Sequence, residues 1–133
     1  MKRLQTIYLV DNDSSAREGL TKLLTVAGYN VEAFSSPEDF FQIQSLDTNA
    51  CLIIDVWESG IMGVDLTTFF VQKNVTIPII FLSAGDENQS RKKARAVQAV
   101  GFFRKPVDGP ALLDAITWAI DTHSRGFTSK EMT

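Results

Sequence analysis

The amino-acid sequence predicts an α/β domain, with one doubly wound parallel sheet of five strands and five helices. Two observations point to this fold class. Short apolar runs alternate along the chain with segments of helical periodicity, which favours right-handed crossovers between parallel strands. Several runs also end abruptly in polar residues, as at Ile7–Asp13 and Leu52–Asp55. Buried strands that open onto a polar edge have this form, so we expect these polar ends to meet at one edge of the sheet.

The composition fits one globular domain with a core of its own. The chain has 133 residues, of which 44% are hydrophobic and 22% are charged, as in ordinary globular domains. The net charge of −3 is too small to indicate a nucleic-acid binder. Cys51 is the only cysteine, which excludes a disulfide framework and a cysteine-based metal site.

The sequence has no recognisable signal peptide and no apolar run of membrane length. We therefore expect a cytoplasmic domain that contacts neither a membrane nor nucleic acid directly. The domain is expected over residues 1–122, and the polar residues 123–133 are expected to form a flexible tail or the start of a linker.

The predicted strands differ in how apolar they are. They are expected at residues 5–10, 29–34, 50–55, 77–82 and 99–103. The third is almost wholly apolar and should lie in the centre of the sheet, covered on both faces, whereas the second should be more exposed. Pro78 lies near the start of the fourth strand, where its missing N–H does least harm.

The first two helices have clear start and stop signals. Ser14 or Ser15 can cap the first helix, and Glu18, three residues after Ser15, fits a capping box. Gly28 is placed to end that helix. Ser36, followed by a proline and two acids, predicts the start of a second helix that runs to about residue 45.

Three further helices are predicted in the second half of the chain. They are expected at residues 64–73, at residues 86–98, and from a cap at Asp108 onwards. The fourth helix carries a basic run over residues 91–95, which fits either a solvated face or a docking patch for an acidic partner.

Oxygen-bearing side chains follow the first and third predicted strands. Asp11, Asn12 and Asp55 offer hard oxygen ligands, which favour Mg²⁺ over zinc. Ser83 ends the fourth strand and Lys105 follows the fifth. A hydroxyl group and a lysine beside metal-binding carboxylates are typical of phosphoryl transfer, in which a carboxylate can be the covalent acceptor.

With these residues the sequence resembles the receiver domain of two-component response regulators, most closely the nitrogen-fixation type. The resemblance covers about residues 7–120. It rests on Val10-Asp11-Asn12-Asp13, Asp55, Gly63, Ser83-Ala84, Phe102 and Lys105-Pro106. It implies a flavodoxin-like fold with strand order 2-1-3-4-5, and a cis peptide bond before Pro106.

The resemblance also implies roles for the site residues. Asp55 is the implied acceptor of a phosphoryl group from a partner histidine kinase or phosphotransfer protein, with Lys105 and Ser83 acting beside it. The implied magnesium ligands are Asp11, Asn12, Asp55 and the backbone carbonyl of Trp57. Ser83 and Phe102 are the implied switch residues, which change the face made by the fourth helix, fifth strand and fifth helix. A homodimer through that face is a possible further partner.

Alternatives to a phosphorylatable receiver stay open. Asn12 stands where the family usually has a second acid, so we expect weaker Mg²⁺ binding. A pseudo-receiver that acts as a phosphorylation-independent interaction module fits this departure. A haloacid-dehalogenase-type phosphatase fits the Asp-x-Asp pattern of Asp11–Asp13 but leaves Asp55 unexplained. A flavin binder of the same fold class would need serine, threonine and glycine where this chain has acids.

Overall fold

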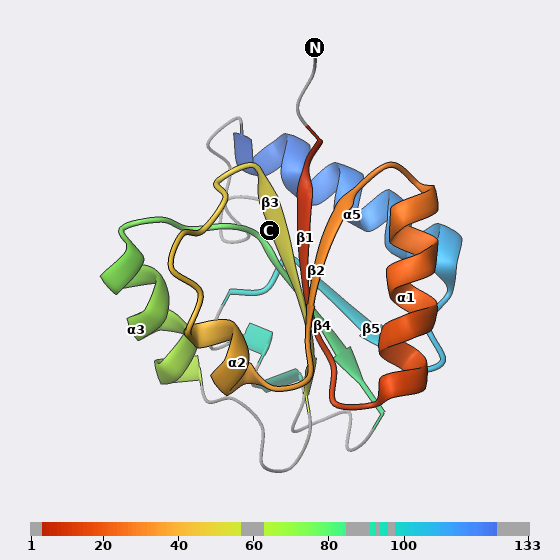
Figure 1. Ribbon diagram of the computed structural model, residues 1–133, viewed down its shortest axis with the longest axis horizontal. Coiled ribbons are helices and arrows are strands. Elements are labelled where there is room, and N and C mark those ends of the chain that lie inside the picture. Colours follow the sequence, from red (N-terminus) through yellow and green to blue (C-terminus); the bar gives the residue numbers. More distant parts are fainter. Residues whose placement is uncertain (1–3, 57–62, 85–90, 93, 96–97, 125–133) are drawn as a thin grey trace.

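The computed structural model describes residues 4–56, 63–84, 91–92, 94–95 and 98–124 (Figure 1). Five strands form one sheet in the order β2-β1-β3-β4-β5, and every neighbouring pair is parallel. The strands are β1 (Thr6–Val10), β2 (Asn30–Phe34), β3 (Ala50–Val56), β4 (Ile79–Ser83) and β5 (Gly101–Arg104). The predicted fold class and strand order are therefore confirmed, and β2 at the edge is the more exposed strand, as predicted.

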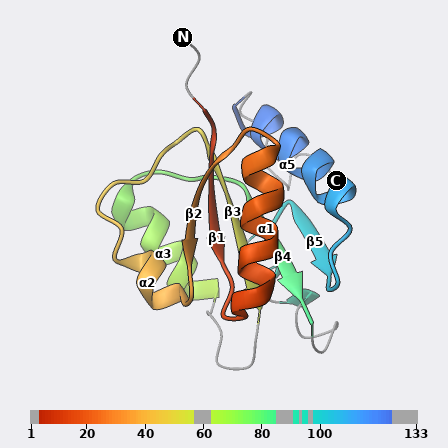
Figure 2. The same cartoon turned by 45° about the vertical axis from the view of Figure 1, so that its right-hand side comes forward.

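Helices cover both faces of the sheet (Figure 2), with α1 and α5 on one face and α2 and α3 on the other. They are α1 (Ser14–Val26), α2 (Pro37–Phe41), α3 (Gly63–Lys73) and α5 (Gly109–Ser124). The predicted fourth helix lies partly outside the described residues, and the part that is described, residues 91–92 and 94–95, is helical. None of the helices in the described ranges is long and apolar enough to cross a membrane.

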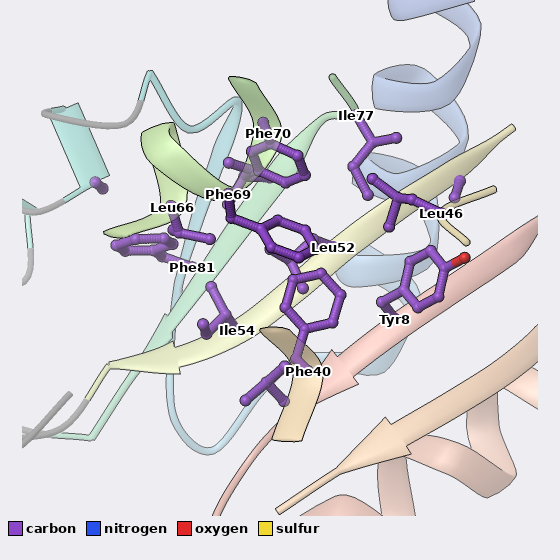
Figure 3. Packing of buried hydrophobic residues seen from close by; sticks show 14 residues of the cluster. Tyr8, Phe40, Leu46, Leu52, Ile54, Leu66, Phe69, Phe70, Ile77 and Phe81 are labelled. Atoms are coloured by element: carbon purple, nitrogen blue, oxygen red, sulfur yellow. The ribbon is translucent and has the colours of Figure 1, made fainter. Parts of the chain in front are cut away.

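Alternating side chains of the strands contribute to two apolar clusters. In β1, Ile7 and Leu9 pack under α1 and α5, whereas Tyr8 and Val10 face the other side. The buried residues of that other side, here called the α2–α3 cluster (Figure 3), are Tyr8, Val10, Phe40, Leu46, Ala50, Leu52, Ile54, Leu66, Phe69, Phe70, Ile77, Ile79, Phe81 and Ala94. Because β1, β3 and β4 are covered on both faces, their carboxyl ends are held rigidly at one edge of the sheet.

The N-terminus of α1 differs from the sequence prediction. The N-cap is Asp13, whose Oδ1 accepts hydrogen bonds from the backbone N–H groups of Ser15 (2.9 Å) and Ala16 (3.2 Å). The predicted cap at Ser14 or Ser15 is therefore wrong. A carboxylate also interacts favourably with the positive end of the helix dipole, which a serine hydroxyl does not match. The predicted end of α1 is confirmed, since Gly28 follows it with φ +103°.

Other boundaries also differ from the sequence prediction, by two residues at the start of β4 and more clearly in α2 and β5. α2 stops at Phe41 instead of about residue 45, and Lys73 of α3 donates hydrogen bonds to the carbonyls of Ile43 and Gln44, which follow it. β5 starts at residue 101 instead of 99, because Ala99 N–H still bonds to the carbonyl of Ala94 in the preceding helix. Gln98, between them, takes a left-handed φ of 57°, a conformation that favours glycine.

α5 begins and packs as predicted. Asp108 Oδ1 accepts a hydrogen bond from Ala111 N–H at 3.2 Å, and Leu112 and Ile116 are fully buried. The helix runs on to Ser124. His123 thus lies in the helix, where its Nε2 is 2.9 Å from the carbonyl oxygen of Thr76 at the start of the segment that leads into β4.

Candidate phosphoryl-transfer site

The predicted polar residues meet at the carboxyl edge of the sheet. Asp11 follows β1 directly, Asp55 lies near the end of β3, Ser83 ends β4, and Lys105 follows β5. Asp11, Asp55 and Ser83 are all buried, with 0%, 5% and 2% of their surfaces exposed. Because three neighbouring strands and the end of β5 fix these side chains, the site is preorganised by the sheet itself.

Lys105 joins the two carboxylates. Its Nζ lies 2.9 Å from Asp11 Oδ2 and 3.2 Å from Asp55 Oδ2. The backbone N–H of Lys105 donates to the carbonyl of Ser83 at 2.8 Å, which ties the lysine to the end of β4. The peptide bond between Lys105 and Pro106 is cis, as the resemblance implied.

Asp11 is held in a single orientation by contacts at every polar group. Its Oδ1 accepts from Asp13 N–H at 2.9 Å, its Oδ2 accepts from Lys105, and its backbone N–H bonds to the carbonyl of Phe34. Arg17 of α1 donates from Nη1 to the backbone oxygen of Asp11 at 2.7 Å. Arg17 is not predicted from the sequence, since only the helix phase set by the Asp13 cap directs its side chain back to the loop.

Asp55 differs from Asp11 in having one carboxylate oxygen without a partner. Asp55 Oδ1 is buried and has no hydrogen-bond partner in the described part of the chain. Burial and the negative charge of Asp11 raise the pKa of Asp55 to about 6, although Lys105 acts in the opposite direction. At neutral pH the carboxylate is therefore mostly charged, and its Oδ1 is an unused acceptor inside the site.

The pKa of Lys105 is also perturbed. Burial lowers it, but the hydrogen bond to Asp11 and the charges of Asp55 and Asp11 outweigh burial, so the pKa of the ammonium group is raised. Lys105 therefore keeps its positive charge throughout the pH range in which Asp55 titrates.

Two other predicted site residues lie outside this buried group, and a third is not among the described residues. Asn12 is exposed beside the buried Asp11, so its amide lies at the rim of the site. Phe102 of β5 is half-buried against the α2–α3 cluster, and the guanidinium carbon of Arg91 lies 4.7 Å from the centroid of its ring. Trp57, a predicted ligand through its carbonyl, lies outside the described residues.

Comparison with known proteins decides the family. A family model described as the response regulator receiver domain matches residues 7–117. This chain belongs to the response regulator receiver family. The receiver domain is 35% identical over 118 residues to the response regulator protein TodT of Pseudomonas putida, covering 89% of this chain and 52% of TodT. It is 33% identical over 115 residues to the transcriptional regulatory protein TdiR of Thauera aromatica, covering 86% of this chain and 51% of TdiR.

A solved structure agrees with these relatives. The crystal structure of FixJ-N superimposes with a TM-score of 0.76 at 25% identity, covering 90% of this chain and 96% of FixJ-N. The chain spans about half the length of the curated relatives it matches. The receiver domain is thus a signalling module of two-component systems, and its relatives are response regulators.

Receiver domains generally bind Mg²⁺ at their acidic pocket, and the residues present here fit such an ion. Asp11 and Asp55 are both buried and share one ammonium group, and a buried charge is costly unless an opposite charge compensates it. The described residues hold no group of three or more histidine, cysteine or acidic side chains that could bind a metal. They do offer the carboxylates of Asp11 and Asp55, and Mg²⁺ commonly binds through one or two carboxylates and keeps several waters.

Proposed function

We propose that this receiver domain is a phosphorylatable switch that accepts a phosphoryl group on Asp55 from a partner histidine kinase or phosphotransfer protein, in the cytoplasm. The observation that carries the proposal is the buried Oδ1 of Asp55, which has no hydrogen-bond partner among the described residues. Lys105 occupies Oδ2 of both carboxylates, so Oδ1 is the oxygen of this pair that is left to act as a nucleophile.

The phosphoryl transfer forms one covalent bond to the protein and breaks one bond in the donor. An oxygen of the Asp55 carboxylate attacks the phosphorus of the donor's phosphohistidine. The P–N bond breaks, its electron pair stays on the imidazole nitrogen, and an acyl phosphate remains on Asp55. Since the pKa of Asp55 is about 6, the nucleophilic carboxylate is the major form at neutral pH and is lost as the pH falls through that value.

The charged side chains stabilise the transferring group. Lys105, already within hydrogen-bond distance of both carboxylates, supplies positive charge where phosphoryl oxygens gather. Asp11, Asn12, Asp55 and the carbonyl of Trp57 are the proposed ligands of Mg²⁺, which supplies further charge neutralisation when bound. Asp11 is suited to this role because Arg17, Asp13 and Lys105 fix its orientation.

The output follows from a shift between two states. We propose that Ser83 moves to the bound phosphoryl group and that Phe102 turns inward, which changes the face made by the fourth helix, β5 and α5. A partner, or a second copy of the chain, reads that face. The matched region covers about half of TodT and of TdiR, and TdiR is a transcriptional regulatory protein, so we further propose that the natural output is transcription regulation.

A phosphorylation assay tests the proposal against its alternatives. The protein is treated with acetyl phosphate and Mg²⁺, and separately with a histidine kinase, and its intact mass is measured. We expect one phosphoryl adduct, absent in Asp55→Asn. The matched control is Asp114→Asn, which removes one exposed carboxylate from α5 and should leave the adduct in place.

Each alternative predicts a different result. A pseudo-receiver, which Asn12 at the metal-binding loop would favour, gains no adduct from either donor. A phosphatase of the haloacid-dehalogenase type gains an adduct that maps to Asp11. Either result would overturn the proposed acceptor role of Asp55.

A further inference from the structure

Arg91 lies against the ring of Phe102 at the edge of the apolar core. The guanidinium carbon is 4.7 Å from the ring centroid, well within the range in which a cation is attracted to an aromatic face. Arg91 itself is exposed and helical, and Phe102 is half-buried. The contact therefore joins an exposed cation to a half-buried ring that packs against the apolar core.

The ring of Phe102 has an apolar alternative close by. Phe102 packs against the α2–α3 cluster, which includes Ala94, a residue three positions after Arg91 and 7% exposed. Residues three apart lie on the same side of a helix. Arg91 therefore lies beside the buried Ala94, at the edge of the cluster. In the inward state proposed above, the ring turns toward this cluster and leaves the guanidinium.

The strand that carries Phe102 is connected to the phosphoryl-transfer site. β5 pairs with β4 so that Phe102 is opposite Phe81 and Arg104 is opposite Ser83. Lys105 follows β5 directly and bonds through its backbone to Ser83. A change of the Phe102 ring and a change at Ser83 or Lys105 are thus linked through one short strand.

We propose that Arg91 is a positioning residue that holds Phe102 in its half-buried place and so opposes the switch. This inference rests on the proposed function, because it concerns the regulation of that same site. A state with Phe102 inward loses the cation–aromatic contact, so the contact favours the opposite state. By reciprocity, a ligand that favours the inward state must bind more weakly while the contact is present.

The experiment measures the affinity of the receiver domain for beryllium fluoride, a non-covalent phosphoryl mimic, in the presence of Mg²⁺. Binding is followed by heteronuclear NMR. We expect Arg91→Gln to bind the mimic about two- to five-fold more tightly than the wild type, from the usual strength of an exposed cation–aromatic contact. Arg91→Lys keeps the positive charge but lacks the planar guanidinium group. Its affinity for the mimic should lie between those of the wild type and Arg91→Gln.

Two controls separate the ring contact from other effects. Arg95→Gln removes a charge from an exposed position one turn further along the same helix, and its affinity should stay within about 1.5-fold of the wild type. Arg91 takes part in a further interaction, so the cycle with Phe102→Leu is needed. In the Phe102→Leu background, Arg91→Gln should no longer change the affinity. Urea unfolding measures the stability of each variant. If the role of Arg91 is merely structural, its replacement changes the stability and leaves the affinity for the mimic unchanged.

The outcomes distinguish this inference from the proposed function. If the wild type gains a phosphoryl adduct but Arg91→Gln binds the mimic no better than Arg95→Gln, the role of Arg91 is overturned and the acceptor role of Asp55 stands. The role is also overturned if the effect of Arg91→Gln persists without the ring. If the wild type gains no adduct and binds no mimic, the proposed function and this inference both fail.

Discussion

Removing the negative charge of Asp55 is expected to stabilise the fold at neutral pH. Burial, together with the charge of Asp11, raises the pKa of Asp55 from 3.8 to about 6, against the opposing effect of Lys105. A shift of about two units corresponds to roughly 3 kcal/mol as an upper bound. Because the neighbouring Lys105 and Asn12 are in contact with solvent, screening reduces this, and we expect Asp55→Asn to gain about 1–2 kcal/mol in free energy of unfolding.

The sign of the pH dependence follows from the direction of the shift. The folded protein binds the Asp55 proton more tightly than the unfolded chain does, since the folded pKa is the higher one. The destabilisation is complete above about pH 6, shrinks as the pH falls through that value, and is absent below the unfolded pKa of about 3.8. The advantage of Asp55→Asn should therefore disappear on acidification.

Urea denaturation of both proteins at about pH 7.5, 6 and 4.5, without divalent cations, measures this difference. Asp114→Asn is the matched control, because it removes the same charge from an exposed position on α5 and should show no such pH-dependent gain. The reasoning would be refuted if Asp55→Asn is less stable than the wild type at about pH 7.5. It would also be refuted if the difference in free energy of unfolding between the two proteins does not change with pH.

Three further predictions concern neighbouring residues. Lys105→Met leaves Asp11 and Asp55 without their shared cation, so it should lower the free energy of unfolding by about 2–4 kcal/mol at neutral pH; a loss that acidification does not reduce would contradict this. Asp13→Ala should cost about 0.5–2 kcal/mol in thermal unfolding through loss of the cap, and Ser15→Ala should stay within about 0.5 kcal/mol. Asn12→Asp should bind Mg²⁺ more tightly by calorimetry, and equal affinities would show that the amide is no handicap.

The sheet could be predicted from the sequence because buried parallel strands consist of short apolar runs. β1, β3 and β4 are such runs, and the predictions that β3 is the central strand and that β2 is more exposed are both confirmed. The boundaries could not be predicted equally well, because they depend on contacts with distant segments. The end of α2 is an example, since the carbonyls that follow it accept hydrogen bonds from Lys73, about thirty residues away.

The same distinction applies to the site. Asp11, Asp55, Ser83 and Lys105 could be predicted because strand ends must meet at one edge, whatever the loops do. The contacts made from the flanking helices could not, since they depend on where each helix begins. Arg17 reaches the carbonyl of Asp11 only because α1 starts after an aspartate cap, whereas the sequence predicts a serine cap.

The placement of Asn12 changes what its missing charge should cost. The attraction between a charge and a cation is several-fold weaker in water than in a partly buried site. Asp11 and Asp55 are buried, whereas Asn12 is exposed. The second acid usual in the family is therefore replaced at the position where a negative charge contributes least to Mg²⁺ binding. The expected gain in Mg²⁺ affinity from Asn12→Asp is therefore about ten-fold at most. A loss of this size leaves a site that fills at moderately higher metal concentration, which favours a phosphorylatable receiver over a pseudo-receiver.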